Sequence, residues 1–236
     1  MKRWLFVGKS DKRDLLLYLC SALAATGLKV LLADGTENGK YRYALGGNDS
    51  RLAVTEFCGF DVITGPLTAA QVSVKRSDGK IDNGYDYELY DLESLSGLGP
   101  EWFATADEIV WVTSYDRYEV EASAQWFRTL LHLWPQLRGM TIRPVYIRTV
   151  DCYLNSDYIM SFMDGLALEW REEAIRIPWN ELNLAVQLEN EHAGRLHLAH
   201  LSRSYKRALR QLLHELAGWE STVARKALRQ AERRQA

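Results

Sequence analysis

Cysteine and proline are scarce in this chain, at three and five residues out of 236. The cysteines, Cys20, Cys58 and Cys152, form neither an even set nor a Cys-x-x-Cys pair, which excludes the usual disulfide framework and zinc knuckle. Free thiols are typical of a reducing compartment. No run reaches about 18 uninterrupted apolar residues, and Lys2 and Arg3 lead directly into a short apolar segment rather than a signal peptide. We therefore expect a cytoplasmic protein.

Signatures of several enzyme and metal-binding classes are also missing. No Gly-x-Ser-x-Gly segment marks a nucleophilic serine, and no Cys/His pairing can be argued from spacing. Among the five histidines, His197 and His200 lie at helical spacing, but no third ligand accompanies them. The acidic run at residues 82–88 lacks the calcium-loop pattern. The sequence therefore predicts no metal centre built from these residues.

The residues that are present have the composition of a folded domain. Hydrophobic residues make up 47% of the chain and charged residues 25%, which argues against disorder. No internal repeat or low-complexity linker divides the sequence. We therefore expect one α/β domain over residues 1–217, followed by a basic helix or tail over residues 218–236.

Segments of strand length alternate with segments of helix length. The predicted strands cover residues 3–7, 29–33, 87–90, 108–113, 142–147 and 174–177, and the predicted helices residues 12–25, 118–133, 156–172 and 202–217. Such alternation favours a three-layer fold, in which helices cover both faces of a twisted, mostly parallel sheet. Two polar segments interrupt the pattern. We expect a surface loop at residues 35–50 and, from the turn signals at residues 69–85, a hairpin or extended loop.

The loop between the first predicted strand and helix reads Gly8-Lys9-Ser10-Asp11-Lys12-Arg13. A phosphate-binding loop needs glycines whose backbone N–H groups face the phosphates, a lysine that reaches their oxygens, and a Ser or Thr that binds Mg²⁺. Lys9, Lys12 and Arg13 cluster at a helix start, where the helix dipole disfavours cations. Either an anion binds there, or Asp11 and Asp14 satisfy the basic side chains locally.

This loop resembles that of the ParA/MinD-like ATPases, the SIMIBI-class P-loop proteins with a deviant Walker A motif written KGGxGK[ST]. Other segments match in the family's order: residues 22–34 (ALAATGLKVLLAD), 84–91 (GYDYELYD), 106–113 (ADEIVWVT) and 177–181 (IPWNE). The resemblance covers roughly residues 3–217. It implies a P-loop fold, a site for ATP and Mg²⁺, and a homodimer, because family members commonly pair face to face across the nucleotide. The positions it assigns to phosphate and metal binding are Gly8, Lys9, Lys12, Arg13, Asp34 and Asp91.

The motif is degenerate at the positions that carry the chemistry. Asp11 replaces the glycine before the lysine and would aim a carboxylate at phosphate oxygens, while Arg13 replaces the Mg²⁺-binding hydroxyl and cannot coordinate the metal. Thr36 replaces the second acid after the second strand, Arg148 the base-reading asparagine, and residues 92–97 the PPG switch. We expect a protein without ATP hydrolysis or a bound cofactor that acts as a scaffold or localisation factor through protein partners. The alternative is a slow ATP-binding switch that uses Lys9 and Lys12.

Charge is distributed unevenly along the chain. Residues 195–236 contain ten Lys or Arg and three Glu, a net +7, so the preceding 194 residues carry −9 of the total −2. A basic segment on an acidic body suits DNA, an anionic surface or an acidic partner, although a solvated helix end with no specific role is the simpler interpretation. The candidate contact residues are Arg203, Lys206, Arg207, Arg210, Arg225, Lys226, Arg229, Arg233 and Arg234.

Overall fold

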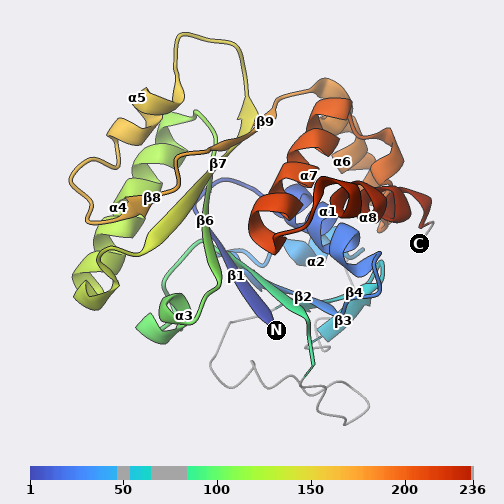
Figure 1. Ribbon diagram of the computed structural model, residues 1–236, viewed down its shortest axis with the longest axis horizontal. Coiled ribbons are helices and arrows are strands. Elements are labelled where there is room, and N and C mark those ends of the chain that lie inside the picture. Colours follow the sequence, from blue (N-terminus) through green and yellow to red (C-terminus); the bar gives the residue numbers. More distant parts are fainter. Residues whose placement is uncertain (47–53, 65–83, 235–236) are drawn as a thin grey trace.

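The computed structural model describes residues 1–46, 54–64 and 84–234, and within these ranges nine strands form one sheet (Figure 1). The strand order is β3-β4-β2-β5-β1-β6-β7-β8, and β9 also pairs with β7. The strands are β1 (Lys2–Val7), β2 (Val30–Gly35), β3 (Val54–Phe57), β4 (Phe60–Thr64), β5 (Tyr87–Leu92), β6 (Glu108–Thr113), β7 (Thr141–Thr149), β8 (Glu169–Trp170) and β9 (Ile175–Pro178). All pairs are parallel except β3 with β4, which form an antiparallel hairpin at one edge.

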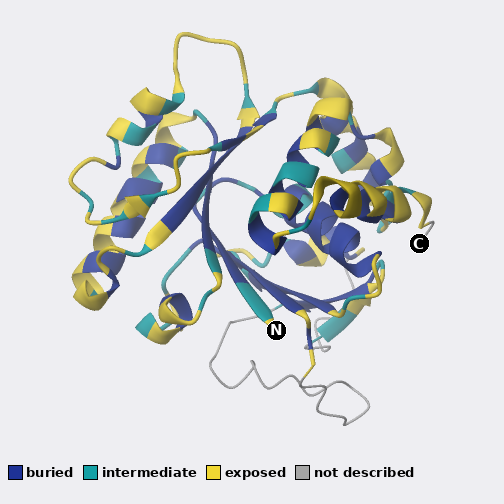
Figure 2. Cartoon of the chain, in the orientation of Figure 1, coloured by how far each residue is buried: buried dark blue, intermediate teal, exposed yellow. Residues whose placement is uncertain are grey.

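Helices cover both faces of the sheet, as the sequence predicts. They are α1 (Arg13–Ala24), α2 (Tyr41–Ala44), α3 (Pro100–Ala104), α4 (Arg117–Leu133), α5 (Ser156–Ser161), α6 (Glu181–Ala193), α7 (Arg203–Ala217) and α8 (Ser221–Arg233), with short 3-10 turns at Pro135–Leu137 and Leu198–His200. One core lies between the sheet and the layer of α1, α7 and α8; a second lies under α3 and α4 (Figure 1). The central strands read as continuous apolar runs because both of their faces are buried (Figure 2).

The predicted strands are confirmed, whereas one predicted helix is wrong. The helix expected over residues 156–172 ends at Ser161, and Gly165 then adopts a left-handed conformation (φ 77°) that takes the chain away from helical geometry towards β8. The polar segment at 35–50 contains the short helix α2, and α6 and the β3–β4 hairpin were not predicted. The turn signals at residues 69–83 lie outside the described residues.

The C-terminal helices form a hairpin against α1. Helix α7 buries the apolar face that its spacing predicts, with Tyr205, Leu209 and Leu212 among its buried residues. Helix α8 packs on α7 and α1 through a face that includes Ala224 and Leu228. Among the described residues, no helix is both long and apolar enough to cross a membrane.

We expect Leu209→Ala to lower the free energy of unfolding by about 2–5 kcal/mol, because this completely buried side chain would leave a cavity between α7 and the sheet. Leu182→Ala, at a half-exposed position of α6, should change it by less than about 0.5 kcal/mol. Urea unfolding of the two variants measures both values. Equal losses would show that α7 does not bury its apolar face as described.

Candidate functional site

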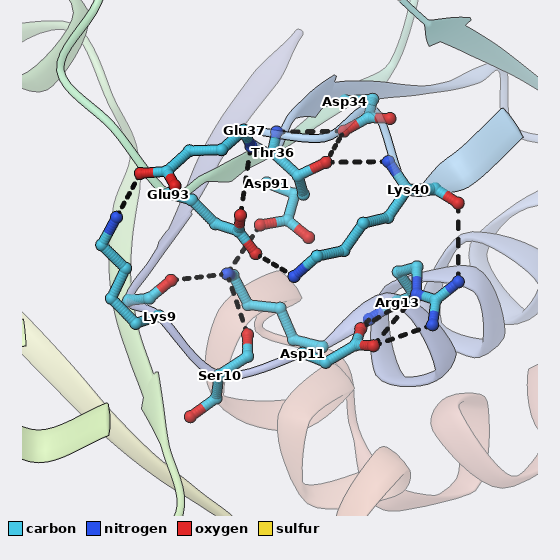
Figure 3. Close-up of polar contacts among 12 residues, drawn as sticks. Lys9, Ser10, Asp11, Arg13, Asp34, Thr36, Glu37, Lys40, Asp91 and Glu93 are labelled. Carbon is cyan, nitrogen blue, oxygen red and sulfur yellow. Dashed lines mark hydrogen bonds and ion pairs between the residues drawn. The ribbon is translucent and has the colours of Figure 1, made fainter. Parts of the chain in front are cut away.

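The residues assigned to phosphate and metal binding meet at the carboxyl ends of β1, β2 and β5, where the loop at residues 8–12 joins β1 to α1 (Figure 3). Asp91 lies near the end of β5 and is in register with Phe6 on β1 and with Asp34 on β2. The sheet thus brings together, at one edge, side chains that are far apart in the sequence. This is the edge at which parallel α/β sheets bind ligands.

Gly8 has a packing role that does not depend on any ligand. Its φ of +126° is one that residues with a side chain rarely adopt, and an added Cβ would lie 2.4 Å from the carbonyl oxygen of Val112. The glycine is therefore required by the close approach of the loop to β6.

Lys12 points into the protein and is completely buried. Its Nζ lies 2.6 Å from Asp91 Oδ1 and donates to the carbonyl oxygens of Gly8, at 2.9 Å, and Ser10, at 3.4 Å. The contact with Asp91 is an ion pair in which Oδ1 accepts no hydrogen bond from the described residues, and both hydrogen bonds of the ammonium group are made to the backbone of the loop itself. The ammonium group is therefore enclosed by groups of the protein.

Asp91 is equally enclosed. Its Oδ2 accepts a hydrogen bond of 2.9 Å from the buried hydroxyl of Tyr41, on α2. Burial raises the pKa of Asp91 to about 6, and the neighbouring Lys12 ammonium opposes that rise. The carboxyl group of Asp91 and the ammonium group of Lys12, 2.6 Å apart, form a buried ion pair.

Asp34 organises the loop between β2 and α2. Its Oδ1 accepts hydrogen bonds from the backbone N–H and the hydroxyl of Thr36, and its Oδ2 accepts one of 3.1 Å from the N–H of Tyr41. Its carboxylate thus stabilises the turn that leads to α2 and positions Tyr41 against Asp91.

The other cations around the loop also have carboxylate partners within the protein (Figure 3). Arg13 contacts Asp11 and Glu191, each at 2.8 Å, and Lys40 contacts Glu93 at 2.6 Å. Lys9 pairs with Glu37 near the surface. Burial alone would raise the pKa of Asp11, but the Arg13 guanidinium outweighs this and holds that pKa below its ordinary value.

Of the two acids expected to satisfy the basic cluster, only Asp11 does so. Asp14 instead accepts a hydrogen bond of 2.8 Å from Tyr205 on α7, and burial raises its pKa. The first residue before α1 is Lys12, whose side chain forms no cap. Asp14 therefore does not contribute to the local neutralisation that was one of the two alternatives, because its carboxylate contacts Tyr205 on α7 instead.

Several residues of this site were not predicted. Glu37, Glu93 and Glu191 come from three separate segments, and Glu119, on α4, accepts hydrogen bonds from the hydroxyls of Ser10 and Ser114. Only Glu93 had a signal in the sequence, because it lies within the segment that replaces the expected switch motif. The others are brought to the loop by the fold.

Two features of the loop differ from a site for a magnesium-bound triphosphate. Lys12 and Asp91 neutralise each other, and a guanidinium occupies the position of the metal-binding hydroxyl. Among the described residues, no group of three His, Cys, Asp or Glu side chains is placed to hold a metal ion. Phosphate oxygens that approach the side chains of Lys12 and Arg13 would have to compete with the carboxylates that these cations already contact.

We expect Lys12→Met and Asp91→Leu each to lower the free energy of unfolding by about 3–5 kcal/mol, because each leaves one buried group without its partner. The double variant Lys12→Met/Asp91→Leu should lose much less than the sum of the single losses. A double-mutant cycle from urea unfolding measures this coupling. Additive losses would contradict a direct buried pair.

No protein-family model matches this chain, and neither does any curated protein sequence. Among solved structures, MinD in the MinC:MinD cell division complex of Aquifex aeolicus is similar, with a TM-score of 0.65 and 16% identity over 93% of this chain and 97% of that chain.

Two other similar structures contain nucleotides. The septum site-determining protein MinD of Pyrococcus horikoshii, complexed with Mg-ADP, has a TM-score of 0.57 and 18% identity over 92% of this chain and 98% of that chain. A plasmid partition protein of Borrelia burgdorferi, bound to AMPPNP, has a TM-score of 0.57 and 14% identity over 92% and 99%. The chain therefore has the fold of the ParA/MinD-like P-loop ATPases.

Proposed function

We propose that this protein is a nucleotide-independent, ParA/MinD-like scaffold or spatial-localisation factor, which acts in the cytoplasm through protein partners. The systems that such a protein serves include secretion, pilus, division and partition machinery. In this proposal the fold supplies a rigid platform, and the former nucleotide site is part of its internal structure.

The observation that carries the proposal is the internal neutralisation of the loop. The buried ammonium of Lys12 has its partner in Asp91, and the guanidinium of Arg13 has partners on two sides. A cation that attracts phosphate must present an uncompensated charge to the ligand. Here the ligand would have to break the buried pair, and removing one partner from such a pair costs about 3–5 kcal/mol.

These contacts also join separate elements of the fold at the site. By accepting the Tyr41 hydroxyl, Asp91 connects α2 to β5, and Arg13 connects α1 to α6 through Glu191. The loops at this edge are therefore held in place by side chains alone. A protein stabilised in this way needs no bound nucleotide to present a fixed surface.

We expect millimolar ATP with Mg²⁺ to leave the melting temperature of the purified protein unchanged. A ligand present at about 100 times its Kd would stabilise the fold by about 2.7 kcal/mol, which corresponds to a rise of roughly 5–10 °C for a chain of this size. Thermal unfolding with and without nucleotide measures the shift, and the Pyrococcus horikoshii MinD is the positive control.

A clear rise in melting temperature that Lys12→Ala abolishes would contradict the proposal. It would favour the alternative of a slow ATP-binding switch that uses Lys9 and Lys12. Phosphate release above that of a heat-denatured sample would have the same meaning.

The C-terminal helix hairpin supports a second candidate function, binding to nucleic acid or another anionic surface. Of the nine basic candidates, seven are exposed: Arg203, Arg207, Arg225, Lys226, Arg229, Arg233 and Arg234. The other two are engaged within the fold, since Lys206 pairs with Glu232 at 2.9 Å and Arg210 donates to the carbonyl oxygen of Lys206. Six of these cations belong to α7 and α8, whose exposed residues are yellow in Figure 2, and Arg234 follows α8.

If this face binds duplex DNA, the triple variant Arg225→Glu/Arg229→Glu/Arg233→Glu should weaken binding and reduce the slope of log K against log salt by about three, since each phosphate contact contributes about 0.9. The matched control is Arg117→Glu/Arg128→Glu/Arg138→Glu, three exposed arginines in and after α4. Fluorescence anisotropy at two salt concentrations measures both. Equal slopes for the two triple variants would exclude this surface.

A further inference from the structure

A small cavity lies where the start of α1, the ends of β7 and β9, and helices α6 and α7 meet (Figure 1). It has a volume of about 50 Å³, and its lining includes Asp14, Arg148, Trp179, Asn183, Leu184 and Tyr205. A water-sized group needs roughly 10–15 Å³, so the cavity has room for about four such groups. We call it the Asp14 hollow.

Asp14 brings to this hollow a carboxylate that has no cationic partner. Its Oδ2 accepts a hydrogen bond of 2.8 Å from the hydroxyl of Tyr205, and no Lys, Arg or His among the described residues forms an ion pair with it. Burial raises the pKa of Asp14, and the neighbouring Asp11 carboxylate adds to that rise. A cationic group that enters the hollow would therefore meet a carboxylate that nothing else neutralises.

Asn183 brings to the same hollow a donor that has no acceptor. Its side chain is only 7% exposed, and its Oδ1 accepts from the N–H of Ser202 at 2.9 Å. The buried Nδ2 has no partner among the described residues. Buried polar groups are nearly always hydrogen-bonded, so an unpaired donor in the lining of a cavity points to an acceptor that enters it.

Arg148 adds a positive charge to the lining. Its guanidinium lies 3.6 Å from Glu119, which is too far for a hydrogen bond, and it makes no hydrogen bond to any of the described residues. The backbone of Arg148 is left-handed, with φ 52°, and such strain is often found at functional sites. Because a guanidinium only donates, Arg148 and the amide of Asn183 together suit a carboxylate.

The remaining part of the lining used here is apolar. Trp179 and Leu184 are both about half exposed, so they form part of the rim of the hollow as well as of its lining. An aliphatic group of the ligand could cover both side chains and remove them from water.

We propose that the Asp14 hollow binds a free α-amino acid with a small aliphatic side chain. The ammonium group of this ligand donates to Asp14, and its carboxylate accepts from Asn183 Nδ2 and from Arg148. Its side chain lies against Trp179 and Leu184. An α-amino acid carries a cation, an anion and an apolar group on one carbon atom, and the lining has a partner for each. The inference goes beyond the proposed function, because the ligand is a small molecule and not a protein partner.

The first test is isothermal titration calorimetry of the full-length protein with L-alanine, L-valine and L-leucine at millimolar concentration. We expect saturable binding of at least one of them. The N-acetyl derivative of that amino acid lacks the ammonium group, and its amide lacks the carboxylate. Each should bind at least about 10-fold more weakly, because each loses charge-assisted hydrogen bonds. Adenosine, which is neutral, should not bind.

The second test removes one protein group at a time. Asp14→Asn keeps an acceptor for the hydroxyl of Tyr205 but removes the negative charge, and Asn183→Asp keeps the acceptor for Ser202 but removes the donor. Each should weaken binding of the same amino acid by roughly 10- to 100-fold.

Arg148→Gln should weaken binding to a similar degree, and it should fold normally because this side chain is 43% exposed. If a variant at one of the two less exposed positions does not fold, Arg148→Gln and the blocked derivatives still decide the question. The matched control is Asp164→Asn, which removes an exposed carboxylate outside the hollow and should leave the affinity unchanged.

Three results would overturn this inference and leave the proposed function intact. They are no binding of any of the three amino acids, equal binding of the blocked derivatives, and unchanged affinity in Asp14→Asn and Arg148→Gln. Binding of adenosine that Arg148→Gln weakens would assign the hollow to a nucleobase, and it would overturn both proposals.

Discussion

The buried ion pair between Lys12 and Asp91 is the interaction on which the arrangement of the loops at the carboxyl ends of β1, β2 and β5 depends. It exists because β5 lies between β1 and β2, so that the residue near the end of β5 faces the loop that follows β1. Such a pair is tolerated only when further hydrogen bonds satisfy the remaining donors and acceptors. The carbonyl oxygens of Gly8 and Ser10 and the hydroxyl of Tyr41 provide them. The loop, the start of α1 and the position of α2 are therefore fixed together.

The ion pairs around the loop explain part of the uneven charge distribution of the chain. The first 194 residues carry the acidic excess, and several of their carboxylates surround the basic loop. Four of these carboxylates each pair with a different cation: Asp11 with Arg13, Glu37 with Lys9, Glu93 with Lys40 and Asp91 with Lys12. Most of the basic residues of α7 and α8 are exposed to solvent. The two charged regions therefore offer different chemistry: one is neutralised internally, and the other faces solvent.

The fold alone does not establish a nucleotide-driven activity, since one fold carries many functions and each function depends on its own site. Two similar structures are complexed with Mg-ADP or bound to AMPPNP, and in this chain the cations of the loop pair with carboxylates of the protein. The proposals above therefore rest on contacts in this chain. One of them places a binding surface on the basic helix hairpin formed by α7 and α8.

The alternation of apolar strands and amphipathic helices by itself determined the three-layer fold. Strands that are buried on both faces are apolar along their length, and this can be recognised in the local sequence. The same local pattern failed at residues 156–172, where the chain turns after Ser161, and it did not reveal α6. The sequence also determined which residues in the loop are wrong for Mg²⁺, since that follows from side-chain chemistry. Only the tertiary structure decided that Lys12 is paired with Asp91, that Glu191 reaches Arg13, and that Asp14 turns to Tyr205. Contacts between residues up to 191 positions apart depend on how strands and helices pack, and no local pattern encodes that packing.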